Sequence, residues 1–224
     1  MRVRHAAGPR RTALVTEETR DLILQAAEAE FAARGFATAR LADIAERVGI
    51  TRAAVIYHFR DKQALYDAVL ESAFEPLSEK IEAAVSEPGT NAERIERLVA
   101  AWFNYATERP ALGRLFIREV AEAGNELRPE VQRLGTPLFA ALLHAIEQGQ
   151  RDGEFRSIDA MHVANILSGA TIWLTSGARL MEKDGDSGES RGERLAQHRD
   201  ELVGVARYLL GIRDKEEQMK SSLA

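Results

Sequence analysis

The chain has 224 residues, of which 45% are hydrophobic and 29% charged, and it contains no cysteine, which excludes disulfides and thiolate metal sites. No run approaches the roughly eighteen apolar residues of a membrane helix, and the arginine-rich start lacks the apolar stretch of a signal peptide, so a soluble, cytoplasmic protein is expected. The net charge of −5 is uneven, because residues 1–62 carry 11 Lys/Arg and 8 Asp/Glu while residues 63–224 carry 19 and 27. A basic N-terminal part on an acidic body favours a polyanionic partner.

Residues 1–15 contain four arginines and no acidic residue, and Gly8-Pro9 breaks any helix there. We predict a flexible basic arm, which is either a disordered leader or a segment that follows the groove or backbone of a bound nucleic acid. A first helix is predicted from Thr16, its cap, to Gly35. Thr38 is the expected cap of the helix that follows.

The next stretch predicts two short helices separated by a tight turn. Apolar residues at Leu41, Ile44, Ala45 and Val48 have the spacing of one helix face. Gly49 can close that helix in the left-handed conformation, and the hydroxyl of Thr51 can cap the next one. The pattern predicts a helix-turn-helix, whose second helix fits the major groove of DNA. An ordinary helical hairpin in a bundle is the alternative.

The second of these helices has a narrow apolar seam, Val55 and Phe59, and its other faces are polar or aromatic. Polar rings crowded near the end of so short a helix suit a phosphate backbone better than a plain hairpin. Asp61 is predicted to cap a third helix, with Lys62 where a phosphate could be held.

At this point the sequence resembles a known family. AAEAEFAARGF (26 to 36), LADIAERVGIT (41 to 51) and YHFRDKQALYDAVL (57 to 70) are similar to the N-terminal domain of the TetR family of bacterial transcriptional regulators. The resemblance implies an all-helical, DNA-binding homodimer whose C-terminal domain usually senses a small ligand. Two positions depart from the family pattern: Arg40 replaces a small hydroxyl residue and could reach a phosphate by charge, and Ile56 replaces a tyrosine and offers only apolar contact. The predicted DNA contacts are Arg40, Thr51, Arg52, Ala54, Ile56, Tyr57, His58 and Lys62.

The remainder of the chain shows helical periodicity and no alternating strand pattern. Helices are predicted over 61–85, where Pro76 should kink or divide the helix, and over 91–109 with Asn91 as cap, 111–123, 129–149, 159–181 and 193–212. The fold class is therefore all-α, with an N-terminal three-helix domain at 16–62, a C-terminal helical bundle at 63–213 for ligand binding and dimerisation, and about ten helices in total. Residues 214–224 are predicted to be a disordered tail.

Two features of the bundle suggest function. Aromatic residues with a few polar neighbours are typical of a small-molecule pocket, although each could equally be plain core; the candidates are Trp102, Phe103, Tyr105, Phe116, Phe139, His144, Asn165 and Trp173. The last two long helices are rich in aliphatic and small residues, including Gly169, Ala170, Gly177 and Ala178. In the family, such a pair forms the dimer interface as a four-helix bundle.

Enzymatic signatures are not found: there is no glycine-rich phosphate loop, HExxH or GxSxG. Asp159 and His162 share a helix face but supply only two metal ligands, so neither a cofactor nor a metal is expected. The expected function is a repressor that binds an inverted-repeat operator as a homodimer and is released by a small, mainly apolar ligand. An activator or a ligand-independent regulator of the same fold is the alternative, and a helical enzyme or an interaction adaptor is a further one.

Overall fold

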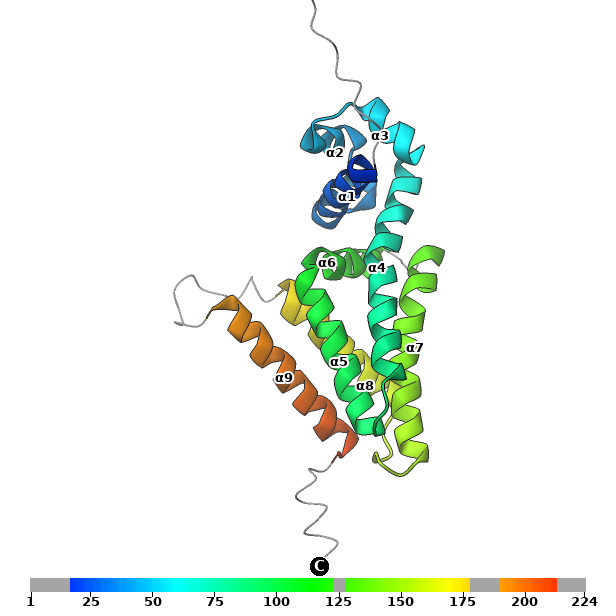
Figure 1. Ribbon diagram of the computed structural model, residues 1–224, viewed down its shortest axis with the longest axis vertical. Helices are drawn as coiled ribbons and strands as arrows, with labels where there is room; N and C mark the ends of the chain where they lie inside the picture. The colour runs from blue at the N-terminus through cyan, green and yellow to red at the C-terminus, as the bar shows by residue number, and fades with distance from the viewer. Residues whose placement is uncertain (1–16, 123–127, 178–189, 213–224) are drawn as a thin grey trace, which may run out of the picture.

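A computed structural model describes residues 17–122, 128–177 and 190–212, and the regular elements of these residues are all helical (Figure 1). They comprise α1 (Glu17–Thr38), α2 (Leu41–Val48), α3 (Arg52–Phe59), α4 (Lys62–Ser86), α5 (Asn91–Glu108), α6 (Pro110–Glu122), α7 (Pro129–Arg151), α8 (Ala160–Ile172), the π-helical segment η1 (Trp173–Gly177) and α9 (Arg191–Leu210). The all-α prediction is confirmed. Within the described ranges, no helix is long and apolar enough to cross a membrane.

The first three helices form one end of the molecule, and α4 runs from them into the body (Figure 1). Gly35, at φ 76° and ψ 165°, breaks α1 near its end, as predicted. Gly49 closes α2 in the left-handed conformation, and the Thr51 hydroxyl accepts a hydrogen bond from the Ala54 amide, as predicted. Asp61 caps α4 in the same way, through the Ala64 amide at 2.8 Å.

Two predicted caps are wrong, and one lies outside the described residues. Arg40, not Thr38, occupies the N-cap of α2, and its side chain makes no capping bond. The cap of α5 is Thr90, which forms a reciprocal capping box with Glu93. Asn91 is instead buried, and its amide donates to Asp152 and Glu154, tying the start of α5 to the turn after α7. The predicted cap Thr16 is not among the described residues.

Pro76 neither ends nor divides α4, which spans 25 residues. Proline has no N–H, so the Ser72 carbonyl, four residues earlier, loses its normal helical donor. The body supplies a replacement: Nη1 of Arg109, just after α5, donates to the Ser72 carbonyl at 2.5 Å. The Tyr105 hydroxyl also donates to the next carbonyl, that of Ala73, at 2.6 Å. A tertiary contact therefore satisfies the one carbonyl that the proline leaves without its helical partner.

In the body, α5 and α7 pack against the lower part of α4, α8 packs against α5 and α7, and α9 packs against α5 and α8. Helix α6 lies between this bundle and α1 (Figure 1). One hydrophobic core runs through both parts, from Ile23 and Phe31 in α1 to Leu202 and Leu210 in α9. Helix α8 begins after Asp159, which caps it, and continues as η1. Of the helix predicted over 159–181, Ala178 and the residues after it lie outside the described residues.

Candidate nucleic-acid interface and inner cavity

The exposed side of α3 carries the main predicted DNA contacts. Thr51, Arg52 and Tyr57 are exposed, and Tyr57 keeps 72% of its surface in contact with solvent, which is unusual for a large aromatic side chain. Ala54 is half-buried, whereas Ala53, which the sequence analysis did not select, is exposed. Ala53 and Tyr57 are one turn apart on the same face. Val55 and Phe59 are buried and hold the opposite face against the core.

Two further residues from the predicted set lie partly inside the domain. Ile56 is half-buried and packs against the hydrophobic core. His58 is half-buried between the rings of Tyr57 and Phe59, with centroid separations of 5.8 and 6.2 Å. Both are therefore placed to support α3 as well as to border its exposed face.

Lys62 has a structural role that the sequence did not reveal. Its ammonium group donates to the carbonyls of Ala37 and Ala39, both at 3.1 Å, and lies 4.7 Å from the centre of the Phe36 ring. Lys62 thus ties the start of α4 to the last turn of α1 and to the loop before α2. An ammonium has three donors, and these two carbonyls use two of them.

The arginines of this domain fall into two groups. Arg34 and Arg47 pair with the buried Glu30 at 3.0 and 3.6 Å, and Arg34 also pairs with Asp43. These ion pairs join α1 to α2, and they neutralise the charges of Arg34 and Arg47. Arg40 and Arg52 are exposed and make no ion pair within the part of the chain that the structure describes, so their charges remain available to a polyanion.

Arg60 completes the basic edge and was not selected from the sequence. It lies between α3 and α4 at φ 61° and ψ −56°, the one non-glycine residue with positive φ among the described residues. Its side chain is 84% exposed and pairs with the neighbouring Asp61 at 3.0 Å. Sequence patterns give no signal for such a conformation at an arginine.

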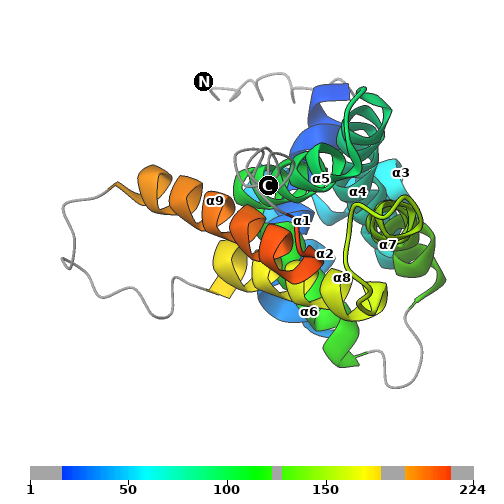
Figure 2. The same ribbon diagram turned by 90° about the horizontal axis from the view of Figure 1, so that it is seen from below.

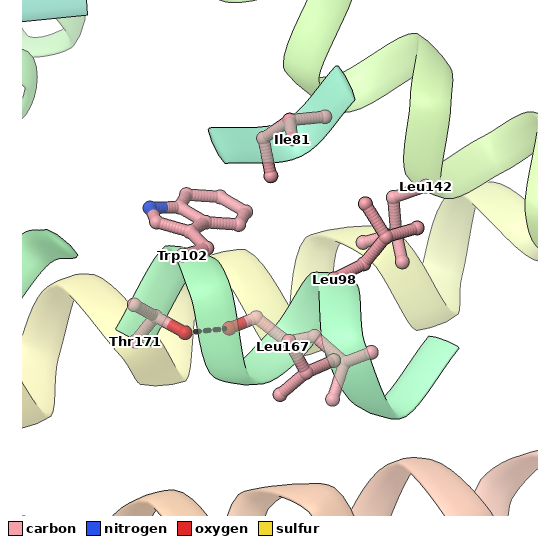
Figure 3. A pocket seen from close by; sticks show the side chains of 7 residues that line it. Ile81, Leu98, Trp102, Leu142, Leu167 and Thr171 are labelled. Atoms are coloured by element: carbon pink, nitrogen blue, oxygen red, sulfur yellow. Dashed lines mark hydrogen bonds between the residues drawn. The ribbon is translucent and has the colours of Figure 1, made fainter. Parts of the chain in front are cut away.

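The inner cavity lies between α4, α5, α7 and α8 and is almost filled. Its volume is about 10 Å³, close to the minimum for one water molecule. Figure 3 shows Ile81 and Trp102 near one another at one side, and the Thr171 hydroxyl donating to the Leu167 carbonyl at 2.9 Å. The lining residues are Ile81, Leu98, Val99, Trp102, Leu142, Leu167 and Thr171.

The structure does not bring the eight predicted pocket residues together. Trp102 alone among them lines this cavity. His144, Asn165 and Trp173 are exposed, so they cannot be its polar and aromatic walls. The others are core or border residues: Phe103 and Tyr105 are buried, and Phe116 and Phe139 are half-buried. Helical spacing predicted which residues share a face, but not which face turns inward.

Polar contacts join the first three helices to α5 and α6. Arg109, just after α5, forms an ion pair with Glu28 of α1, and Arg118 of α6 donates to the carbonyls of Ala32 and Ala33 at 3.0 and 2.6 Å. Burial alone would lower the pKa of Arg109, but its hydrogen bonds to Glu28 and Tyr105 raise that pKa above the ordinary value. Arg109 therefore stays charged while it holds both Glu28 and the Ser72 carbonyl.

A second junction is built around a buried carboxylate in α6. Glu119 accepts a hydrogen bond from the Tyr66 hydroxyl of α4 and pairs with Arg128 at 3.2 Å. The Arg128 guanidinium also lies over the ring of Phe36, 4.5 Å from its centre. Helix α6 therefore links the first three helices to the body in addition to α4.

Helices α8 and α9 lie side by side (Figure 2), and exposed apolar side chains occur on both of them and on η1. Ile166 of α8 and Trp173 at the start of η1 are each 49% exposed, and Val205 and Tyr208 of α9 are 42% and 80% exposed. Gly169 lies between Ile166 and Trp173 in the sequence, and Gly204 lies one turn before Tyr208. A Cβ atom added at either glycine would meet nothing within 4 Å. Single apolar residues are normal on surfaces, whereas several large ones on two adjacent helices make a candidate interaction face.

Comparison with known proteins covers both parts of the chain. The family profile "Bacterial regulatory proteins, tetR family" matches residues 23–69, and "Tetracyclin repressor-like, C-terminal domain" matches residues 92–205. The HTH-type transcriptional regulator TtgR of Pseudomonas putida is 32% identical over 155 residues, which cover 65% of this chain and 74% of TtgR. The HTH-type transcriptional activator FasR of Mycolicibacterium smegmatis is 33% identical over 184 residues, or 81% of this chain and 84% of FasR.

Solved structures share the fold at lower identity. A tetR-family regulatory protein from Rhodococcus RHA1 superposes with a TM-score of 0.71 at 21% identity, covering 89% of this chain and 100% of that one. AibR, crystallised with isovaleryl coenzyme A and operator DNA, superposes with a TM-score of 0.65 at 18% identity, covering 84% and 97%. At these identities the superpositions establish the shared architecture.

Proposed function

This chain belongs to the TetR family of DNA-binding transcriptional regulators, which are not enzymes, and from that premise we propose that it is a ligand-responsive repressor. In this proposal it binds an inverted-repeat operator as a homodimer in the bacterial cytoplasm. A small, mainly apolar molecule then releases it. Each part of the proposal has separate support in the structure.

The exposed side of α3 carries the DNA-binding part of the proposal. Thr51, Arg52 and Tyr57 project from a helix whose other side is anchored by Val55 and Phe59. Such a helix can enter the major groove without disturbing its own core. We place Ala54 and Ile56 at the groove walls, and Arg40, His58 and the remaining donor of Lys62 on phosphates.

The exposed face of α8 and α9 supports the dimer. A two-fold interface uses the same patch on both subunits, and this patch combines apolar side chains with glycines that allow close approach of a second helix pair. A single helix-turn-helix buries little surface on DNA, whereas two modules on one rigid body act at high effective concentration. Two-fold symmetry then requires inverted half-sites about one helical turn apart on the same side of the duplex, or somewhat more.

The cavity and α4 support the response to a ligand. The cavity walls are apolar apart from the indole N–H of Trp102 and the hydroxyl of Thr171, which donates within its own helix. The molecule that enters is therefore mainly apolar; an acyl chain has this chemistry. Small-molecule pockets usually enclose about 300–1,000 Å³, so binding must part the helices. Ile81 of α4 lines the cavity, and the other end of α4 adjoins α3, so displacing α4 moves the DNA-binding end.

An activator of the same fold is the second candidate. The observation that favours it is FasR, which is named an activator and is similar over 81% of this chain. Repressor and activator differ in where the operator lies relative to a promoter. The two share the DNA contacts, the dimer and the coupling described above.

Selection of bound fragments from a genomic pool, followed by gel shift, tests the proposal. We expect an inverted repeat, and inserting about five base pairs between its half-sites should abolish tight binding, because half a helical turn moves one half-site to the opposite side. Tight binding by a monomer to a single unrepeated site would contradict the dimer. The same DNA fragment then tests ligands. Lipophilic compounds that raise the melting temperature of the protein should weaken its gel shift. Compounds that raise the melting temperature but never alter DNA affinity would contradict the coupling between the cavity and α3.

A further inference from the structure

The link between α3 and α4 contains a tight turn with unfavourable backbone geometry. Only Arg60 and Asp61 separate Phe59, the last residue of α3, from Lys62, the first residue of α4. The Asp61 amide donates to the Phe59 carbonyl at 2.6 Å, which closes a three-residue γ-turn with Arg60 at its centre. A central residue near φ 61° and ψ −56° makes this the rare form of the turn, which is strained for a residue with a Cβ atom.

The fold itself gives no reason for an arginine at this position. Glycine adopts positive φ without steric cost, so it would form the same turn more easily. The Arg60 side chain is 84% exposed, and its ion pair is with its chain neighbour Asp61. Exposed pairs of this kind contribute little to stability. Sparsely populated backbone conformations of this kind cluster at functional sites.

The position of Arg60 indicates what its side chain meets. It follows Tyr57 by three residues at the end of the exposed face of α3, so it lies at the edge of the surface that we assign to the groove. The hydrogen bond to Asp61 uses Nε and not the two Nη groups of the guanidinium. A guanidinium presents its donors as a planar fork that matches two oxygens of one phosphate.

We propose that Arg60 is a DNA-backbone contact, and that the γ-turn aims its guanidinium at a phosphate flanking the groove occupied by α3. Asp61 holds both parts of this arrangement. One carboxylate oxygen caps α4 through Ala64, and the other orients Arg60. The inference rests on the proposed placement of α3 in the groove. It adds a contact that depends on the phosphate charge and not on the base sequence.

Three substitutions in the full chain distinguish the effect of the Arg60 charge from the effect of the strained γ-turn. Arg60→Lys and Arg60→Gln retain a side chain at positive φ and differ in charge, whereas Arg60→Gly removes both the charge and the strain. The probe is a random-sequence DNA duplex, because a phosphate contact does not depend on sequence. Affinity is measured by fluorescence anisotropy over a series of salt concentrations, and melting temperature is measured in parallel.

We expect Arg60→Gln and Arg60→Gly to weaken binding on the order of tenfold at low salt. Both should also reduce the slope of log affinity against log salt by about 0.9 per subunit, while Arg60→Lys retains the slope. Arg60→Gly should melt about 2–4 °C above wild type, because it relieves the turn. A more stable protein that binds DNA less well is the combined result expected of a contact held in a strained turn.

An unchanged salt slope in Arg60→Gln and Arg60→Gly would overturn the inference. Arg52→Ala distinguishes this failure from failure of the proposed function. If Arg52→Ala weakens binding and the Arg60 variants do not, α3 is in the groove and only the Arg60 contact is wrong. If none of these variants alters binding, the placement of α3 itself is wrong.

Discussion

The molecule has two exposed faces of opposite chemistry, one on α3 and one on α8 and α9. On and beside α3, the exposed residues are Thr51, Arg52, Ala53, Tyr57 and Arg60, whose polar groups remain well solvated when the protein is free. On α8, η1 and α9, the exposed residues include the large apolar side chains of Ile166, Trp173, Val205 and Tyr208, together with two glycines, Gly169 and Gly204. The first face suits a hydrated polyanion, whereas the second leaves apolar surface in water unless another protein surface covers it.

The two faces should differ in how binding through them depends on salt. Binding through the α3 face should depend strongly on salt, because it releases counterions from DNA. Association through the α8 and α9 face should depend little on salt, because burial of apolar surface is not screened. Altering one face at a time therefore separates the two functions.

The largest effect is expected from charges on the apolar face. Replacing Gly169 and Gly204 together by Glu should leave each subunit folded, since neither position has a neighbour within 4 Å of an added Cβ. The charges should separate the subunits, because an unpaired charge in an apolar interface costs several kcal/mol. Sedimentation should then show a monomer. Gel shift should show that tight operator binding is lost. Ala83→Glu, an exposed charge on α4, is the control, and a double variant that remains dimeric would contradict the assignment.

A smaller effect is expected at the junction between the two regions. Arg109→Gln removes the ion pair with Glu28 and the donor to the Ser72 carbonyl, so we expect a loss of about 1–3 kcal/mol of stability. Glu28→Gln removes only one of these contacts and should cost less. Because the two residues share one interaction, the double variant should melt at nearly the same temperature as Arg109→Gln alone. Strictly additive losses in thermal unfolding would show that the pair is not coupled.

The smallest effect concerns pH. Hydrogen bonds from the Ala64 amide and from Arg60 lower the pKa of Asp61 below its ordinary value of 3.8, and a hydrogen bond from the Ser190 backbone amide lowers the pKa of Glu193 below 4.5. Because the unfolded chain takes up these protons first, the stabilisation is complete above the ordinary values and is lost as the pH falls through the lower, folded values.

Thermal unfolding between about pH 6 and pH 3 measures this effect. Asp61→Asn keeps an oxygen that can cap α4 but does not ionise, so its melting temperature should fall less steeply with acidification than that of wild type. Glu193→Gln is the equivalent variant on α9. Parallel curves for wild type and Asp61→Asn would show that the carboxylate of Asp61 does not stabilise the fold.

The helix-turn-helix could be predicted almost residue by residue because its determinants are local. Gly49 and Thr51 act through their own backbone conformation and nearest turn, and so does Asp61. Thr38 and Asn91 are not caps, because Arg40 occupies the N-cap position of α2 and Thr90 occupies that of α5. The γ-turn at Arg60 was not predictable, because the geometry of α3 against α4 imposes it.

The body could be predicted only to the level of its helices. Which face of a helix turns inward depends on partners distant in sequence, and the aromatic residues were misleading for that reason. Trp102 reaches the cavity, while Trp173, equally large and apolar, lies on the outer face of the helix bundle. Arg109 and Glu119 were missed because buried charges have no signature apart from their partners.

If the protein responds to a ligand as proposed, the nearly filled cavity implies that the binding site is closed when no ligand is present. An entering molecule binds only the fraction of the population in which Trp102 and its neighbours have moved aside, so its apparent affinity is the intrinsic affinity reduced by that fraction. Side chains that never touch the ligand can then set the concentration at which the protein responds, simply by changing how often the helices part. Homologues with similar pockets could respond over very different concentration ranges through packing alone.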